Sequence, residues 1–310
     1  MPFPLFPYPP VFLLLVLPFA KLSAGMSVLF SQLVQFAALA FAIRKLAPDK
    51  SYLFFLVGAL LSPAAANNVL AGSNAVLVAA LIVGGIALLQ ARPLLAGALL
   101  GVVIFKPQFF VLLPLALLAA RQTRALIGMI ACAASLTVIS AALFGPSLWL
   151  DWINVYLHPQ AVAGVNGTDW GHAWDESVST CLMLLGVPKT LATAGEGIAA
   201  LIAAFAVWRA FAASHPARLA VLLVAALLAS PHVSNYDLIL LAIAALLMVR
   251  ALPESSRPLA LMLPLAGWLA PLYNPPRALP LGLVTPLVLL GLIWVFLAEK
   301  PAQNPLQLRG

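Results

Sequence analysis

The sequence predicts an all-α, polytopic integral membrane protein, a helix bundle with about 10–11 membrane spans. Hydrophobic residues make up 64% of the 310 residues and charged residues only 8%, whereas a soluble domain carries roughly 25% charged residues. The mean hydropathy is +1.07. So few charges do not cover a water-facing surface, and lipid is therefore the expected solvent for most of the chain.

Apolar runs long enough to cross the hydrocarbon, or part of it, recur along the whole chain. A spanning helix needs about 20 apolar residues and satisfies its own backbone hydrogen bonds. Several runs are shorter and are expected to extend into their flanks or to form half-helices around a cavity. The expected spans are 24–43, 51–65, 74–90, 93–106, 108–120, 125–145, 190–208, 218–231, 237–249, 258–271 and 279–298.

The basic residues orient these spans. If 24–43 runs from outside to inside, only Lys21, Lys106, Lys189 and Arg277 of the 16 basic residues lie outside. The other twelve then fall in inner loops, as the positive-inside rule requires. The net charge of +7 is thus explained by topology, and no nucleic-acid partner is expected. The C-terminus is predicted to be cytoplasmic, in a cell inner (plasma) membrane.

A single membrane domain, 1–310, is expected, with two segments outside the spans. Residues 1–23 are predicted to lie at the outer surface, because the apolar stretch 11–20 is too short to span comfortably. Residues 145–189 form an extracytoplasmic loop between two helix groups. The N-terminus is then outside without an export signal, so we expect one more helix upstream of this chain.

Polar residues gather at the predicted outer face, and they come from five separate segments. The first four segments contain Tyr8, then Asn67, Asn68 and Asn74, then Lys106 and Gln108, and then Asp169, Asp175 and Glu176 in the long loop; the fifth contains His232, Asn235, Tyr236 and Asp237. The inner loops are short and basic. This asymmetry favours a functional site that faces the periplasm or the exterior.

Two of these residues have ordinary structural explanations beside the functional ones. Lys106 suits an anion such as a phosphate at the outer leaflet, but lysine also snorkels to the interface. Asp237 suits a substrate cavity, but it is also placed to cap the next helix, as are Ser234 and Asn235. No second histidine lies at ligand spacing from His232, so no metal site is predicted.

The order of the polar motifs resembles glycosyltransferase family 87, which is similar to polyprenyl-phosphate-mannose-dependent mannosyltransferases of the GT-C type. The resemblance extends from about Tyr8 to about Leu297. It is carried by Tyr8-Pro9-Pro10, Gly72-Ser73-Asn74, the step from Ala96-Gly97 through Gly101 into Phe105-Lys106-Pro107-Gln108-Phe109, and Ser230-Pro231-His232 through Tyr236-Asp237-Leu238.

The resemblance implies transfer of a hexose, in the first place mannose, from a polyprenyl-phosphate donor. The acceptor is a cell-envelope glycolipid or polysaccharide, and membrane lipid is a further partner. Lys106 and Gln108 then bind the donor phosphate, while Tyr8, the three asparagines 67, 68 and 74, and His232 to Asp237 line the substrate cavity. No cofactor is evident; a divalent metal is compatible with GT-C enzymes, but the sequence shows no ligand set.

The chain departs from the family pattern in three places. The first helix and first outer loop of the family, which hold an acidic residue, are missing. Ser73 replaces a glutamine, and His232 replaces an aromatic residue. The catalytic base is therefore unknown, and Asp169, Asp175 and Glu176 are the substitutes. A transporter or flippase of lipid-linked sugar, or an inactive assembly partner, stays open as an alternative.

Overall fold

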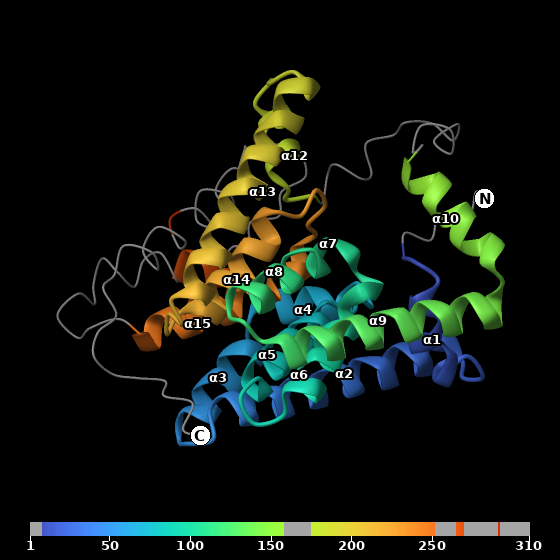
Figure 1. Cartoon of the computed structure of the whole chain (residues 1–310), viewed down its shortest axis with the longest axis horizontal. Coiled ribbons are helices and arrows are strands. Elements are labelled where there is room, and N and C mark those ends of the chain that lie inside the picture. Colours follow the sequence, from blue (N-terminus) through green and yellow to red (C-terminus); the bar gives the residue numbers. More distant parts are fainter. Residues whose placement is uncertain (1–7, 158–174, 252–264, 270–290, 292–310) are drawn as a thin grey trace.

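The described part of the chain is a bundle of helices. The computed structural model describes residues 8–157, 175–251 and 265–269, together with residue 291. Among these residues the β-structure is limited to an isolated antiparallel bridge between Asp175 and Ser234. The predicted all-α membrane bundle is thereby confirmed (Figure 1).

The helices follow the apolar runs closely. The first part of the chain contains α1 (Val11–Val16), η1 (Leu17–Phe19), α2 (Ala24–Leu46), α3 (Ser51–Leu60), α4 (Pro63–Leu70), α5 (Ala75–Leu88), α6 (Pro93–Val102), η2 (Val103–Phe105), α7 (Pro107–Phe110), α8 (Leu112–Ala119) and α9 (Thr123–Phe144). The second part contains α10 (Pro146–Leu157), α12 (Val178–Leu184), α13 (Lys189–Ala212), α14 (Arg218–Leu228), η3 (Asn235–Leu238) and α15 (Ile239–Ala251).

Among the described helices, α2, α9 and α13 are each long and apolar enough to cross a membrane alone. The run 51–65, expected as one span, is bent by 49° between α3 and α4. Ser62 caps α4 and Pro63 begins it, a combination that starts a new helix instead of continuing the old one. The expected span 279–298 lies outside the described residues apart from residue 291, and of 258–271 only 265–269 is described, as helix.

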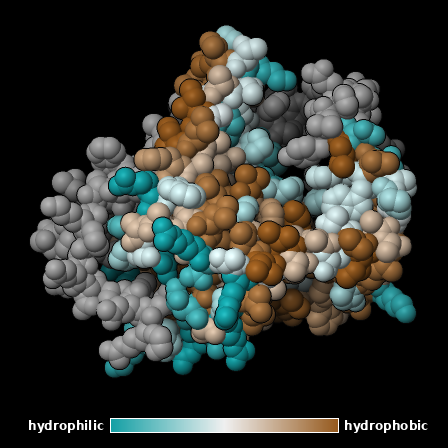
Figure 2. All heavy atoms as spheres, viewed as in Figure 1, coloured by the Kyte–Doolittle hydropathy of each residue, from teal (hydrophilic) through white to brown (hydrophobic). Residues whose placement is uncertain are grey.

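The three long helices expose apolar side chains, and the shorter helices fill the interior. Leu33 on α2, Val138 on α9 and Leu201 on α13 are 55%, 66% and 73% exposed. Figure 2 shows the corresponding hydrophobic surface along α13 and across α9. In contrast, every residue of α14 from Leu219 to Leu228 is buried. Such outward apolar faces are expected where lipid, and not water, surrounds the helices.

Glycines bring α6 and α9 into backbone contact. A Cβ on Gly97 would lie 1.9 Å from the carbonyl oxygen of Ala125, and one on Gly128 would lie 2.3 Å from that of Leu94. A Cβ on Gly101 would lie 2.6 Å from the carbonyl oxygen of Met129. Small residues four apart allow this close approach between membrane helices. The glycine step that precedes Lys106 in the sequence therefore fixes α6 against a long helix.

Candidate functional site

Lys106 lies where one apolar helix breaks and the next begins. Its backbone angles, φ −122° and ψ 78°, are not helical. Pro107 occupies the first turn of α7, and a proline disfavours helical angles in the residue before it. The break leaves Lys106 between two half-length helical segments, Pro93–Phe105 and Pro107–Ala119. Broken helices inside membrane proteins are tolerated where protein or a cavity surrounds the freed backbone.

The ammonium group of Lys106 is paired with Asp237. Lys106 Nζ lies 2.6 Å from Asp237 Oδ1, and the two side chains are only 3% and 2% exposed. The aromatic rings of Phe109 and Tyr236 lie 5.5 and 5.2 Å from the same nitrogen, within the range of cation–π contact. The lysine therefore does not snorkel to the interface, and it stays charged in an enclosed setting because a carboxylate compensates it.

Asp237 takes part in the helix cap, one of the two explanations that the sequence left open, and it also pairs with Lys106. Its Oδ2 accepts a hydrogen bond of 3.1 Å from the backbone N–H of Ser234, and the Ser234 side chain completes the capping box of η3. Its Oδ1 forms the ion pair with the ammonium group of Lys106. The cap residue is Ser234, whereas Asn235 and Asp237 follow inside the turn. Capping thus aims one carboxylate oxygen at the lysine.

Tyr8 and Asn74 approach the same pair from the N-terminal half. The Tyr8 hydroxyl shares a hydrogen bond with the Asn74 side chain and interacts electrostatically with Lys106, Tyr236 and Asp237. Burial raises the pKa of the Tyr8 phenol, while the positive charge of Lys106 acts in the opposite direction. Residues from four separate segments of the chain are thereby brought together.

Several polar atoms near this group find no hydrogen-bond partner in the described part of the chain. They are Ser73 Oγ, Asn74 Oδ1, and both Oδ1 and Nδ2 of Asn235. The three side chains are 6%, 7% and 5% exposed. Buried polar atoms in native proteins are almost always paired, and an unpaired one requires an explanation. These unpaired atoms suit a bound molecule that carries hydroxyl groups.

The side chain of Asn68 is already hydrogen-bonded within the protein. Its Oδ1 accepts hydrogen bonds from the N–H groups of Ala75 and Val76, at 3.0 and 3.3 Å, and its Nδ2 donates to Gln32 Oε1 at 2.7 Å. Gln32 and Gln35 both donate to the carbonyl oxygen of Ser73, at 2.9 and 3.1 Å. These glutamines on α2 were not predicted, although two amides three residues apart on an apolar helix were a readable signal.

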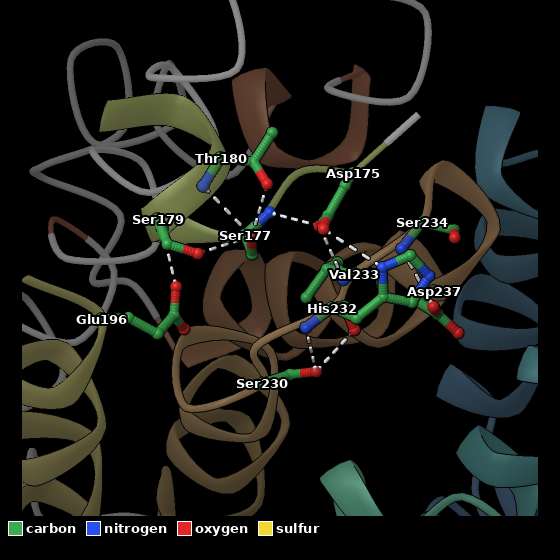
Figure 3. Close-up of polar contacts among 10 residues, drawn as sticks. All are labelled: Asp175, Ser177, Ser179, Thr180, Glu196, Ser230, His232, Val233, Ser234 and Asp237. Atoms are coloured by element: carbon green, nitrogen blue, oxygen red, sulfur yellow. Dashed lines mark hydrogen bonds and ion pairs between the residues drawn. The ribbon is translucent and has the colours of Figure 1, made fainter. Parts of the chain in front are cut away.

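A second acid–base pair joins the long loop to the turn before η3 (Figure 3). Asp175 Oδ2 lies 3.1 Å from His232 Nδ1, and the side chains are 8% and 55% exposed. Asp175 Oδ1 accepts from the backbone N–H of Ser177 at 2.9 Å and of Val233 at 3.1 Å. The N–H of Glu176 donates to the carbonyl oxygen of Val233 at 2.7 Å. The loop and the turn are thus joined at several points.

The protonation of this pair follows from these contacts. The hydrogen bond with Asp175 raises the pKa of His232 against the opposing effect of burial, and the charges of Asp237 and Lys106 also act on it. Burial alone raises the pKa of Asp175, but its hydrogen bonds with His232 and the two backbone N–H groups outweigh burial and lower it. The two pairs therefore belong to one electrostatic neighbourhood.

The sequence profile of glycosyltransferase family 87 matches residues 6–231. The chain belongs to glycosyltransferase family 87. No curated protein and no solved structure matches it at a significant level. Family membership and the apolar helices together indicate a membrane glycosyltransferase, which uses a sugar donor and an acceptor.

The remaining predicted site residues of this family 87 chain are not members of the two acid–base pairs. Gln108 is half-buried and makes no hydrogen bond with a described residue, and Asn67 is half-buried on α4. Glu176 is half-buried beside Asp175. Asp169 lies outside the described residues. Within the described ranges no group of three or more His, Cys, Asp or Glu side chains is arranged to hold a metal ion.

Glu196 on α13 is a buried acid that the sequence did not single out. Its Oε2 accepts a 2.7 Å hydrogen bond from the backbone N–H of Ser179 (Figure 3). Its Oε1 is buried without a partner among the described atoms. The contact ties α12, which begins three residues after Asp175, to α13. The sequence signal for Glu196 was a single acidic residue in an otherwise apolar span.

Proposed function

We propose that this chain transfers a hexose, in the first place mannose, from a polyprenyl-phosphate donor to a glycolipid or polysaccharide of the cell envelope. The proposal places the reaction on the extracytoplasmic side of the inner (plasma) membrane. The observation that carries it is the buried Lys106–Asp237 pair at a broken helix, beside unpaired amide groups, in a family of glycosyltransferases.

Lys106 suits the phosphate of the donor. An ammonium group has three N–H donors, and Asp237 Oδ1 takes one of them. The others are available to a phosphate oxygen, and the attraction is strong where water is excluded. When the bond between sugar and phosphate breaks, the negative charge on the departing phosphate grows, so a fixed cation lowers the energy of the transition state. Gln108, two residues further on, is a second donor in the proposed phosphate site.

The unpaired amides suit the sugar. Asn235 and Asn74 offer donors and acceptors that lack partners, and sugar hydroxyls are both donors and acceptors. Buried polar groups that remain unpaired until the substrate binds discriminate strongly against ligands without matching hydroxyls. Tyr8, hydrogen-bonded to Asn74, is placed to hold one of these amides in position.

The function is tested by sugar transfer from a radiolabelled polyprenyl-phosphate mannose to a membrane lipid extract. The informative variant is the double substitution Lys106→Gln/Asp237→Asn, which removes both charges and leaves no unpaired ion. We expect transfer to fall about 10²–10³-fold, the usual effect of losing one transition-state donor. Lys189→Gln, at an exposed lysine, is the matched control and is expected to retain full activity.

Three results decide against the proposal. Undiminished transfer in the double variant removes Lys106 from the donor site. Use of a nucleotide sugar in place of the lipid-linked donor changes the donor class. Movement of the labelled lipid across a vesicle membrane, without transfer to any acceptor, makes the protein a transporter.

The sidedness is tested separately with single cysteines. Lys189 and Arg121 are both exposed, and the basic-residue distribution puts them on opposite faces. In a background without Cys132 and Cys181, Lys189→Cys is expected to react in whole cells with a membrane-impermeant thiol reagent. Arg121→Cys is expected to react only after the cells are opened. The reverse pattern inverts the proposed orientation.

A further inference from the structure

A buried carboxylate holds an exposed imidazole at the edge of the candidate site. The Asp175 side chain is 8% exposed and that of His232 is 55% exposed. Asp175 Oδ2 lies on the Nδ1 side of the ring. Since an ionised carboxylate only accepts, Nδ1 carries the proton, and the lone pair of neutral His232 is on Nε2. No described residue hydrogen-bonds to Nε2.

We propose that His232 is the general base of the transfer reaction and that Asp175 is the residue that positions it. The proposal rests on the glycosyltransferase function proposed above. It assigns the proton-accepting role that the sequence left unassigned, and it assigns it to an imidazole instead of to a carboxylate.

Asp175, Asp237 and Glu196 are buried carboxylates that each have at least one oxygen already engaged. Asp175 Oδ1 accepts two backbone hydrogen bonds and Oδ2 faces His232. Asp237 Oδ1 pairs with the Lys106 ammonium group, and its Oδ2 accepts a hydrogen bond from the Ser234 N–H. Glu196 is 8% exposed and bonded to the Ser179 N–H. Among the aspartates of the two pairs and Glu196, none combines a free lone pair with access from outside, whereas Nε2 of His232 does.

The backbone around His232 is also fixed. Ser230 Oγ donates to the carbonyl oxygen of His232 at 2.6 Å, and the N–H of His232 lies 3.4 Å from the same Oγ. The next residue, Val233, donates its N–H to Asp175. The ring is thus held from its backbone and from Nδ1, which leaves Nε2 as the reactive end. A base held in this way costs little reorganisation in the transition state.

The position of His232 suits the base of a two-sided site. It interacts electrostatically with both Lys106 and Asp237, so the base and the phosphate cation lie in one neighbourhood. The acceptor hydroxyl gives its proton to Nε2 as its oxygen bonds to the anomeric carbon of the donor sugar. The bond from that carbon to the phosphate oxygen breaks, and the phosphate departs with the electron pair, held by Lys106. The imidazolium that forms is stabilised by Asp175.

The charged groups that face His232 decide the pH response. Asp175 and Asp237 favour the imidazolium, and Lys106 and burial oppose it. Activity is expected to rise with pH as His232 loses its proton. Because Asp175 raises the pKa of His232, removing that carboxylate is expected to move the rising limb of the profile to lower pH.

The test compares His232→Gln, Asp175→Asn and the control Asp151→Asn, at an exposed carboxylate on α10, in the transfer assay over a range of pH. We expect His232→Gln to lower kcat about 10²–10⁴-fold, the usual contribution of a general base, with little change in the donor KM and loss of the rising limb. Asp175→Asn is expected to lower kcat less and to shift that limb to lower pH. Asp151→Asn is expected to behave as the wild type does.

Rescue separates chemistry from structure. In His232→Gly, added imidazole is expected to restore part of kcat in proportion to its unprotonated fraction, which a purely structural histidine does not allow. Transfer by His232→Gln at near wild-type kcat, with the rising limb intact, overturns the base and leaves the proposed function standing. Absence of transfer by the wild-type chain overturns the proposed function together with the base.

Discussion

The two acid–base pairs beside η3 differ in how far water reaches them. Lys106 and Asp237 are 3% and 2% exposed, whereas His232 and Asp175 are 55% and 8% exposed. The first pair joins a lysine to a carboxylate away from solvent, and the second contains an imidazole, whose ordinary pKa lies near neutrality. The enclosed pair is thus suited to hold a fixed charge, and the open pair to exchange a proton.

The largest expected difference between the pairs concerns the stability of the fold. Lys106→Gln alone leaves Asp237 as a buried, unpaired charge, which typically costs about 3–5 kcal/mol of the free energy of unfolding. The double variant Lys106→Gln/Asp237→Asn is expected to recover most of that loss. Unfolding of the detergent-solubilised protein by denaturant, measured for both single variants and the double variant, gives the coupling energy.

The same cycle on the open pair supplies the comparison. For Asp175→Asn and His232→Gln we expect a coupling well below that of the buried pair, because His232 is half-exposed and solvent screens it. Equal coupling energies in the two cycles would mean that burial does not distinguish them.

The next largest effect is expected from a substitution that displaces Lys106 but leaves His232 in place. A Cβ on Gly97 would lie 1.9 Å from the carbonyl oxygen of Ala125, so Gly97→Ala forces α6 away from α9. Overpacking of this kind costs about 1–3 kcal/mol, occasionally more, and displaces Lys106 at the end of the same helical segment. We expect lower thermal stability and weaker donor binding, while the His232 limb of the pH profile stays in place.

Gly197→Ala is the matched control for that substitution. Gly197 also lies within a helix, α13, and a Cβ there meets nothing within 4 Å. Replacing glycine by alanine in an open helical position is neutral or stabilising by about 0.5–1 kcal/mol. A loss of stability as large as that of Gly97→Ala would show that the α6–α9 contact is not the cause.

A smaller effect is the pH dependence of the contact between the loop and the turn. The raised pKa of His232 gives stabilisation that is fully present below its ordinary value of about 6.5 and is lost as pH rises through the folded value. The lowered pKa of Asp175 gives stabilisation present above about 3.8 and lost as pH falls through its folded value. The contact is therefore strongest between these limits.

Hydrogen exchange measures that contact directly. Protection of the Val233 and Glu176 amides, corrected for the intrinsic pH dependence of exchange, is expected to fall several-fold from pH 6 to pH 9. Asp175→Asn is expected to lower the protection and to flatten its pH dependence. A wild-type protection that does not change over this range contradicts the assigned protonation.

The smallest effect is expected at an exposed pair on the predicted inner face. Arg250 Nη2 lies 3.1 Å from Asp49 Oδ2, with side chains 33% and 59% exposed. Hydrogen bonds from Ser51 and Arg250 lower the pKa of Asp49 from 3.8 to about 2. Its contribution is present above about pH 4 and lost as pH falls towards 2. Because solvent screens so exposed a pair, Asp49→Asn is expected to lower thermal stability only slightly at neutral pH. That small difference from the wild type is expected to disappear as pH falls towards 2.

The helices and the grouping of polar residues could be predicted because both follow from local patterns. Apolar runs gave the expected spans, and the basic residues indicated which loops lie together, so Lys106 and Asp237 were assigned to one face. Their direct contact was not predictable, since hydropathy does not specify which side chains of one face meet. The bend before Pro63 was missed because the apolar run continues across it, although Ser62-Pro63 is a helix-start signal.

The contacts within the candidate site were less predictable than the fold. Asp175 was selected as a candidate base and His232 as a cavity residue, but nothing in their spacing indicated that one orients the other. Gln32 and Gln35 were overlooked because an amide in an apolar helix does not stand out by charge. Asn68 looked like a cavity residue, yet its hydrogen bonds to Ala75, Val76 and Gln32 use its side chain to hold a turn.

The glycine contact between α6 and α9 has a consequence for biosynthesis. Lys106 precedes Asp237 by 131 residues, which is roughly 10 s of translation at about 5–20 residues per second. During that interval the lysine has no counter-ion from η3, and a charge within a membrane costs about 2.5–3.5 kcal/mol even by insertion measurements. Gly97, Gly101 and Gly128 lie close in sequence, so α6 and α9 pair as soon as both are made. Their early pairing holds the unneutralised lysine in place until its aspartate is synthesised.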